Sequence, residues 1–158
     1  MNFIPVNIPL LNGNEKRYLC ECIDTGWISS EGEFVKRFET GMADYVGRKY
    51  GIAVCNGTVA IDLAVEALCL VKGDEVIMPT FTIVSCIAAL VRKGIKPTLV
   101  DADPTTWNMD VTQIEDKITN KTKAIMVVHL YGLPVDMDAV IDIAKRHNLY
   151  IIEDCAEA

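Results

Sequence analysis

Three carboxylates stand close together in the last part of this sequence. Glu153 and Asp154 directly follow residues 148–152, and Glu157 lies three residues beyond Asp154. Residues 148–152 have the apolar, β-rich composition of a central parallel strand covered on both faces, and open α/β sheets bind ligands at the carboxyl ends of such strands. Burying a carboxylate there is costly unless it meets a cation or several donors. Asp154 is therefore either the partner of a cationic ligand group or the cap of a following helix.

A second candidate site follows another apolar run, where the sequence reads Val-Cys-Asn-Gly-Thr-Val-Ala over residues 54–60. A strand, a glycine turn and a helix that begins at a hydroxyl residue would form an anion-binding cradle, because helix N-termini carry unpaired N–H groups. Gly57 would let a phosphate approach the backbone, and Thr58 would add a hydroxyl donor. The alternative is that Gly57 only turns the chain and Thr58 only caps the helix. The glycine pattern matches neither a Walker loop nor a dinucleotide fingerprint.

Two further loops carry polar residues after predicted strands. An apolar strand-to-helix turn contains the polar residues Thr80, Thr82 and Ser85, and such a loop could cover the face of a flat ligand. A capped helix with a buried Phe81 explains these residues equally well. His129 also follows a strand, where it is either a base or a structural hydrogen-bonding group.

The elements that must position these residues alternate along the chain. We expect strands at residues 50–55, 75–78, 96–100, 124–128 and 149–153. We expect helices at 14–25, 33–46, 58–71, 83–92, 111–117 and 137–146. This alternation predicts an α/β fold with a mainly parallel sheet covered by helices. Residues 1–47 are predicted to be a helical arm, and residues 48–158 to form the sheet domain.

Composition excludes several kinds of partner. The chain has 158 residues, 22 acidic against 15 basic, for a net charge of −7 with no basic run, so we expect no binding to nucleic acid or to an anionic membrane. Its longest strongly apolar run, residues 81–91, is too short to span a bilayer, and a cytoplasmic location is predicted. Cys20 and Cys22 lack zinc-site spacing and the other four cysteines lie in apolar stretches, so we expect free thiols and no metal.

Five motifs stand in the order found in one known family. They are Gly-Trp-Ile-Ser-Ser at 26–30, Asn-Gly-Thr-Val-Ala at 56–60, Pro-Thr-Phe-Thr at 79–82, Val-His-Leu-Tyr-Gly at 128–132 and Glu-Asp-Cys-Ala-Glu-Ala at 153–158. Together they resemble the DegT/DnrJ/EryC1/StrS sugar-nucleotide aminotransferases. The resemblance implies the aspartate-aminotransferase (type I) fold and the cofactor pyridoxal 5′-phosphate (PLP), so that residues 48–158 would be an incomplete PLP-binding large domain.

The resemblance also implies cofactor contacts. Gly57 and Thr58 would bind the phosphate. Asp154 would face the pyridine nitrogen, where a carboxylate keeps the ring protonated. Glu157 would lie near the ring hydroxyl or the sugar. Ile83 occupies the position where many relatives stack an aromatic side chain on the ring.

Substrate binding and catalysis are implied in the same way. Trp27, Ser29 and Ser30 would approach a sugar nucleotide, and the resemblance implies a homodimer whose interface this loop would reach. Glutamate would donate the amino group, and the acceptor would be a 4-keto-6-deoxy sugar nucleotide. The family's Schiff-base lysine follows the aspartate in a Gly-Asn-Lys context, which no lysine of this chain shares. We therefore expect an N-terminal portion of such an enzyme, without the catalytic residue and inactive alone.

Two other interpretations stay open at this stage. In one, the chain belongs to a dehydratase relative in which histidine replaces the lysine. In the other, it is a non-enzymatic α/β module that binds an anionic ligand or a partner protein.

Overall fold

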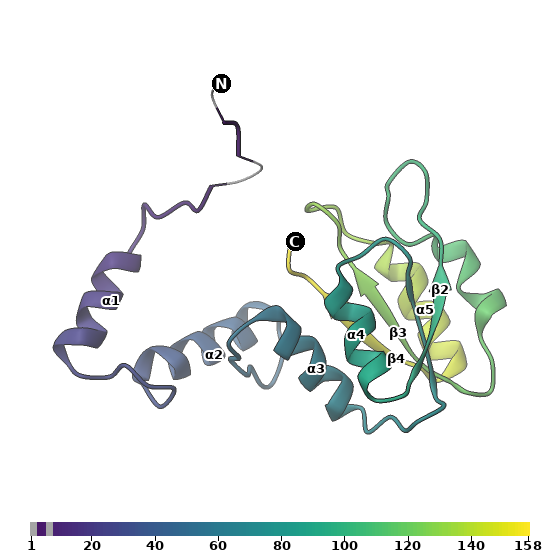
Figure 1. The fold of residues 1–158 in the computed structure, drawn as a ribbon, viewed down its shortest axis with the longest axis horizontal. Coiled ribbons are helices and arrows are strands. Elements are labelled where there is room, and N and C mark those ends of the chain that lie inside the picture. The colour runs from purple at the N-terminus through teal and green to yellow at the C-terminus, as the bar shows by residue number, and fades with distance from the viewer. Residues whose placement is uncertain (1–2, 6–7) are drawn as a thin grey trace. The chain divides into compact units, whose positions relative to one another are not determined.

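The chain consists of two compact units, Met1–Ala53 and Val54–Ala158. They are described separately below from a computed structural model that covers residues 3–5 and 8–158 (Figure 1). The division falls a few residues beyond the predicted end of the helical arm. No helix in the described residues is long and apolar enough to cross a membrane.

The described residues of the first unit form two helices, α1 (Glu15–Asp24) and α2 (Glu33–Tyr45). They pack through Tyr18 and Phe34, whose ring centroids are 4.9 Å apart. The strand predicted at residues 50–55 is absent: these residues form no strand, and the Ala53 N–H donates to the Glu39 carboxylate at 2.9 Å. Apolar composition suits a strand, but a strand forms only where a neighbouring backbone completes the hydrogen-bond ladder.

The second unit alternates helices with strands. The helices are α3 (Gly57–Ala67), α4 (Val84–Arg92) and α5 (Met137–His147), and the strands are β1 (Glu75–Pro79), β2 (Lys96–Val100), β3 (Thr122–Val128) and β4 (Tyr150–Asp154). The helix predicted at 111–117 is two 3₁₀ turns, η1 (Val111–Gln113) and η2 (Glu115–Lys117). The Asp110 carboxylate caps η1 through the Thr112 N–H, and this local bond favours a short turn over a continuous helix.

The four strands form one sheet in the order β2-β1-β3-β4, and every pair is parallel. The predicted α/β fold with a parallel sheet is therefore confirmed. Within the described residues β4 is an edge strand paired only with β3, and Tyr150 at its start is 58% exposed.

Helices cover both faces of this sheet (Figure 1). Successive side chains of a strand point to opposite faces, so Met126 of β3 packs against α3 and α4, and Ile125 and Val127 pack against α5 and the 3₁₀ turns. All residues from Ala124 to Val127 of β3 are fully buried. Apolar packing on both faces thus fixes the direction and register of the strands that carry the candidate site.

One buried carboxylate lies at the amino end of the sheet. Glu75 is 5% exposed, and its two oxygens accept from Thr119 Oγ1 at 2.6 Å and from Lys96 Nζ at 2.9 Å. The Thr119 hydrogen bond, followed by the Lys96 contact, lowers the pKa of Glu75 despite its burial. The ionised form is therefore favoured in the folded chain.

Acid is expected to destabilise the chain through Glu75. Its pKa in the folded state is lower than the ordinary value of 4.5, so its stabilisation is complete above that pH and disappears as the pH falls through the folded-state pKa. Urea unfolding curves at several pH values from neutral to about 3 should show a smaller loss of stability in Glu75→Gln than in wild type. The exposed Asp116→Asn serves as control, and equal acid sensitivity of wild type and Glu75→Gln would contradict this role.

Candidate functional site

The amino ends of two helices lie at the carboxyl edge of the sheet. Arg92 and Lys93, at the end of α4, form ion pairs with Asp62 and Glu66 in the second half of α3. The two helices therefore run in the same direction, as Figure 1 also shows. The first turn of α4 contacts Asp154 at the end of β4, so the start of α3 faces the same edge of the sheet.

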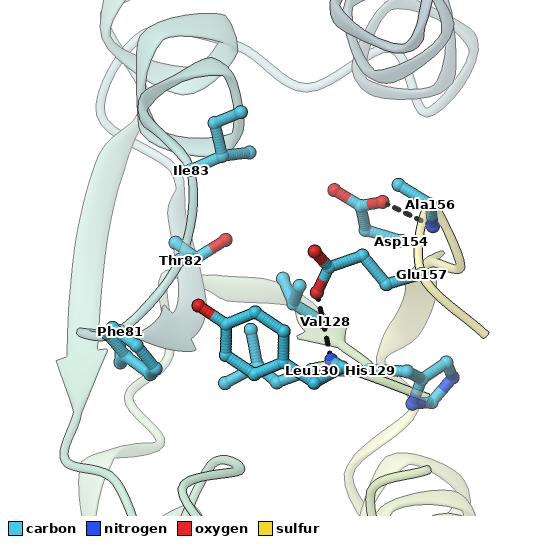
Figure 2. Close-up of a pocket in the computed structure, with 10 residues that line it drawn as sticks. Phe81, Thr82, Ile83, Val128, His129, Leu130, Asp154, Ala156 and Glu157 are labelled. Atoms are coloured by element: carbon cyan, nitrogen blue, oxygen red, sulfur yellow. Dashed lines mark hydrogen bonds between the residues drawn. The ribbon is translucent and has the colours of Figure 1, made fainter. Parts of the chain in front are cut away.

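A cavity of about 310 Å³ opens at this edge. Figure 2 shows residues 81–83 along one side and the three residues Asp154, Ala156 and Glu157 on the other. Residues 128–131 complete the lining. The loop after β1 and the end of β4, distant in the sequence, thus form two sides of one cavity.

Asp154 lies half-buried at this cavity, and both carboxylate oxygens accept a hydrogen bond. Oδ1 accepts from the Ala156 N–H at 3.1 Å, and Oδ2 accepts from the Cys86 thiol at 3.3 Å. Each oxygen has two lone pairs, so a donor on a ligand can still bind. The bond from Ala156 closes a local turn after β4, and both roles of Asp154, partner of a cationic ligand group and cap of a following helix, stay predictions.

Cys86 differs from the other cysteines. It is fully buried, whereas Cys55, Cys69 and Cys155, which we expected inside apolar stretches, lie outside the helices and strands and are exposed. Burial, together with the neighbouring Asp154 carboxylate, raises the pKa of the Cys86 thiol to about 11. Cys86 therefore stays protonated near neutral pH and acts as a donor rather than as a nucleophile.

Glu157 connects the end of the chain to the loop after β3. One of its carboxylate oxygens accepts from the Tyr131 N–H at 2.8 Å. Tyr131 has a φ of +50°, a left-handed conformation that is uncommon for residues other than glycine. The Glu157 bond helps to hold this strained residue at the cavity.

His129 is a structural acceptor. It is 4% exposed, and its Nδ1 accepts from the Val135 N–H at 3.1 Å. A neutral ring that accepts at Nδ1 carries its proton on Nε2, which lies 3.6 Å from Glu153. His129, Glu153 and Cys155 offer atoms within 4.8 Å of one another, but a metal ion needs the Nε2 lone pair. The tautomer therefore favours an N–H donor over a metal ligand.

Asn108 is the positioning residue that inspection of the sequence missed. Its side chain, 3% exposed, donates to the Leu133 carbonyl at 2.8 Å and to the Pro134 carbonyl at 3.3 Å. Its Oδ1 accepts from the Leu130 N–H at 3.2 Å. Asn108 and His129 together hold the loop that carries Tyr131. No motif or periodicity marks Asn108 in the sequence.

The start of α3 has free donors. Asn56 caps the helix by accepting from the Val59 N–H at 3.0 Å, so Asn56, and not Thr58, is the cap. Gly57 and Thr58 are exposed, and their N–H groups donate to no atom in the part of the chain that the structure describes. A Cβ added to Gly57 would meet nothing within 4 Å. This end of the helix is therefore open to an anion.

The remaining predicted site residues lie in both units. Ile83 is 64% exposed and lines the cavity. Trp27 and Ser29 line an apolar groove within the first unit, and the exposed Ser30 lies outside that groove. The roles predicted for these residues toward cofactor and sugar nucleotide stay predictions.

The cavity has the features that a flat, phosphorylated, cationic ring requires. Apolar side chains such as Val128 and Ile83 can contact the ring faces, and the Asp154 carboxylate can accept from a protonated ring nitrogen. The free N–H groups of α3 at the same edge can bind a phosphate. The described residues fit PLP on these grounds, and the cavity lining contains no lysine.

Comparison with known proteins identifies the family. Residues 9–158 match the DegT/DnrJ/EryC1/StrS aminotransferase family. The chain belongs to this family. This result confirms the resemblance carried by the five sequence motifs.

Individual members of the DegT/DnrJ/EryC1/StrS family are similar over nearly the whole chain. It is 51% identical over 158 residues to GDP-perosamine synthase of Escherichia coli O157:H7, covering 100% of this chain and 43% of that protein. The aminotransferase of Psychrobacter cryohalolentis matches with a TM-score of 0.85 at 38% identity, over 95% of this chain and 38% of that one. The structure of E. coli GDP-4-keto-6-deoxy-D-mannose-3-dehydratase with bound hydrated PLP matches with a TM-score of 0.88 at 30% identity, over 95% of this chain and 40% of that one. The chain thus spans less than half the length of these relatives.

Proposed function

We propose that this chain provides the cofactor-holding part of a PLP-dependent sugar-nucleotide aminotransferase of the GDP-perosamine synthase type. The acceptor is a 4-keto-6-deoxy sugar nucleotide, the amino donor is glutamate, and the working unit is a homodimer in the cytoplasm. The Asp154 carboxylate at the apolar cavity is the observation that carries the proposal. PLP supplies the aldehyde that carries the amino group and the ring that withdraws electrons.

Each residue of the site has one task in this proposal. Asp154 accepts a hydrogen bond from the protonated ring nitrogen and keeps that proton in place. Gly57 and Thr58 bind the phosphate with N–H and hydroxyl donors. Ile83 contacts a ring face, and Glu157 lies near the ring hydroxyl or the sugar. Trp27, Ser29 and Ser30 contact the sugar nucleotide.

Sequence identity supports an aminotransferase over a dehydratase. Both kinds of relative give similar TM-scores, 0.85 for the aminotransferase and 0.88 for the dehydratase, so backbone geometry does not discriminate between them. The identity of 51% to GDP-perosamine synthase is well above the 30% to the dehydratase. This difference makes amino transfer the better-supported reaction.

The 158 residues alone are proposed to be inactive, because the cavity lining has no lysine that could form a Schiff base. Adding PLP and then borohydride tests this, since reduction links PLP permanently to any lysine that has formed a Schiff base. We expect scattered, low-level labelling of exposed lysines in a peptide map. Stoichiometric labelling of one lysine would contradict the proposal.

Binding of pyridoxamine 5′-phosphate (PMP) tests the cofactor site directly, because this amine form of the cofactor needs no lysine. Thr58→Val removes one hydroxyl donor to the phosphate and should weaken PMP binding about tenfold, measured by calorimetry. The affinity for pyridoxamine, which has no phosphate, should be unaffected by the substitution.

The matched control is Thr40→Val, which makes the same change at an exposed helical threonine of the first unit. Equal affinity of wild type and Thr58→Val for PMP would place the phosphate elsewhere. Absence of PMP binding by the wild-type chain would contradict the proposed function.

A further inference from the structure

A partly buried hydrogen-bond chain joins the start of α4 to the end of β4. The Thr82 hydroxyl donates to Cys86 Sγ at 3.3 Å, and the Cys86 thiol donates to Asp154 Oδ2 at 3.3 Å. A thiol has one proton, and an ionised carboxylate only accepts, so the S–H must point at Asp154. The direction of the whole chain of bonds is therefore determined.

Cys86 provides the long-range contact of this carboxylate. The other bond to Asp154 comes from Ala156, two residues away, whereas Cys86 is 68 residues away. Cys86 lies in the first turn of α4. Ile83, the N-cap residue of this helix three positions earlier, lines the side of the cavity opposite Asp154. Cys86 is fully buried, and the half-buried Asp154 carboxylate that accepts its bond lines the cavity.

We propose that Cys86 is a positioning residue that fixes the Asp154 carboxylate against α4, so that this carboxylate meets the cofactor's ring nitrogen in one orientation. This inference rests on the proposed function. Thr82 acts in the same chain by holding the thiol in its donating rotamer. Cys86 itself touches neither cofactor nor substrate.

Infrared spectroscopy tests the contact without any cofactor. The difference spectrum between wild type and Cys86→Ser identifies the S–H stretching band of Cys86, since serine has no thiol. Asp154→Asn should shift this band to higher frequency, because an amide oxygen is a weaker acceptor than a carboxylate. A band that Asp154→Asn leaves in place would refute the hydrogen bond itself.

PMP binding tests the consequence of the contact. Cys86→Ala removes the donor and should weaken PMP binding about tenfold, whereas Cys86→Ser keeps a donor and should recover most of the affinity. Cys155→Ala, at an exposed cysteine, is the matched control and should bind like wild type. Urea unfolding of both Cys86 variants separates positioning from a general loss of stability.

The outcomes distinguish the two proposals. Equal PMP affinity of Cys86→Ala and wild type would refute the positioning role. An equal loss of PMP affinity in Cys86→Ser and Cys86→Ala would also refute the positioning role. Both variants lose packing volume, but only Cys86→Ala loses the hydrogen-bond donor. A wild-type chain that fails to bind PMP would refute the proposed function and, with it, any role of Cys86 toward a cofactor. The infrared result would still decide whether the bond exists.

Discussion

Replacing Asp154 by asparagine is expected to lower the pH at which bound PMP loses its ring-nitrogen proton by about 1 to 3 pH units. The carboxylate favours the cationic ring, and the neutral amide does not. The proton therefore leaves at lower pH in the variant. An absorbance titration of the PMP complex measures this change, and affinity at neutral pH should fall about tenfold or more.

The fold should survive this substitution, because the asparagine carbonyl can still accept one of the two bonds made by Cys86 and Ala156. Glu153→Gln is the matched control. It neutralises the adjacent carboxylate, which approaches His129 and does not line the cavity. Identical titration curves for wild type and Asp154→Asn would contradict the proposed contact between Asp154 and the ring nitrogen.

The second large effect is expected from Asn108→Leu. Leucine is similar in size but removes the partners of the Leu130 N–H and of the Leu133 and Pro134 carbonyls. Leaving buried polar groups unpaired should reduce the free energy of unfolding by about 2 to 4 kcal/mol. This loss is a large share of the total free energy of unfolding of a domain of ordinary stability. Urea denaturation measures it.

Asn120→Leu is the control, because Asn120 is exposed in a turn. The loop that Asn108 holds carries Tyr131, whose N–H binds Glu157, so Asn108→Leu should also weaken PMP binding under conditions where the chain is folded. A stability equal to that of Asn120→Leu would show that water replaces the lost bonds without cost.

The four strands of the sheet could be predicted from local sequence. Residues 75–78, 96–100, 124–128 and 149–153 were expected, and each observed strand differs by at most two residues at either end. These strands are short apolar runs bounded by turn residues, and each one finds a parallel neighbour in the sheet. Residues 50–55 have similar composition, but a strand also needs a pairing partner, which local composition cannot reveal.

The location of the candidate site was also predictable in part. The carboxyl ends of parallel strands meet at one edge, and this rule brought Ile83, Asp154 and Glu157 to the same cavity. Gly57 and Thr58 stand at the start of α3, which faces that edge. Their contacts with a phosphate, like those of Trp27, Ser29 and Ser30 with a sugar nucleotide, stay predictions.

The sequence by itself determined the family, the parallel α/β fold and the residue types at the ends of the strands, because apolar periodicity and short motifs are local properties. Only the tertiary structure decided that Cys86 donates to Asp154 and that Asn108 holds the loop after β3. Neither residue belongs to a local pattern, and their partners lie 68 and 22 to 26 residues away. Hydrogen bonds require donor and acceptor within a few tenths of an ångström of about 3 Å, and only packing of the whole sheet places them so closely.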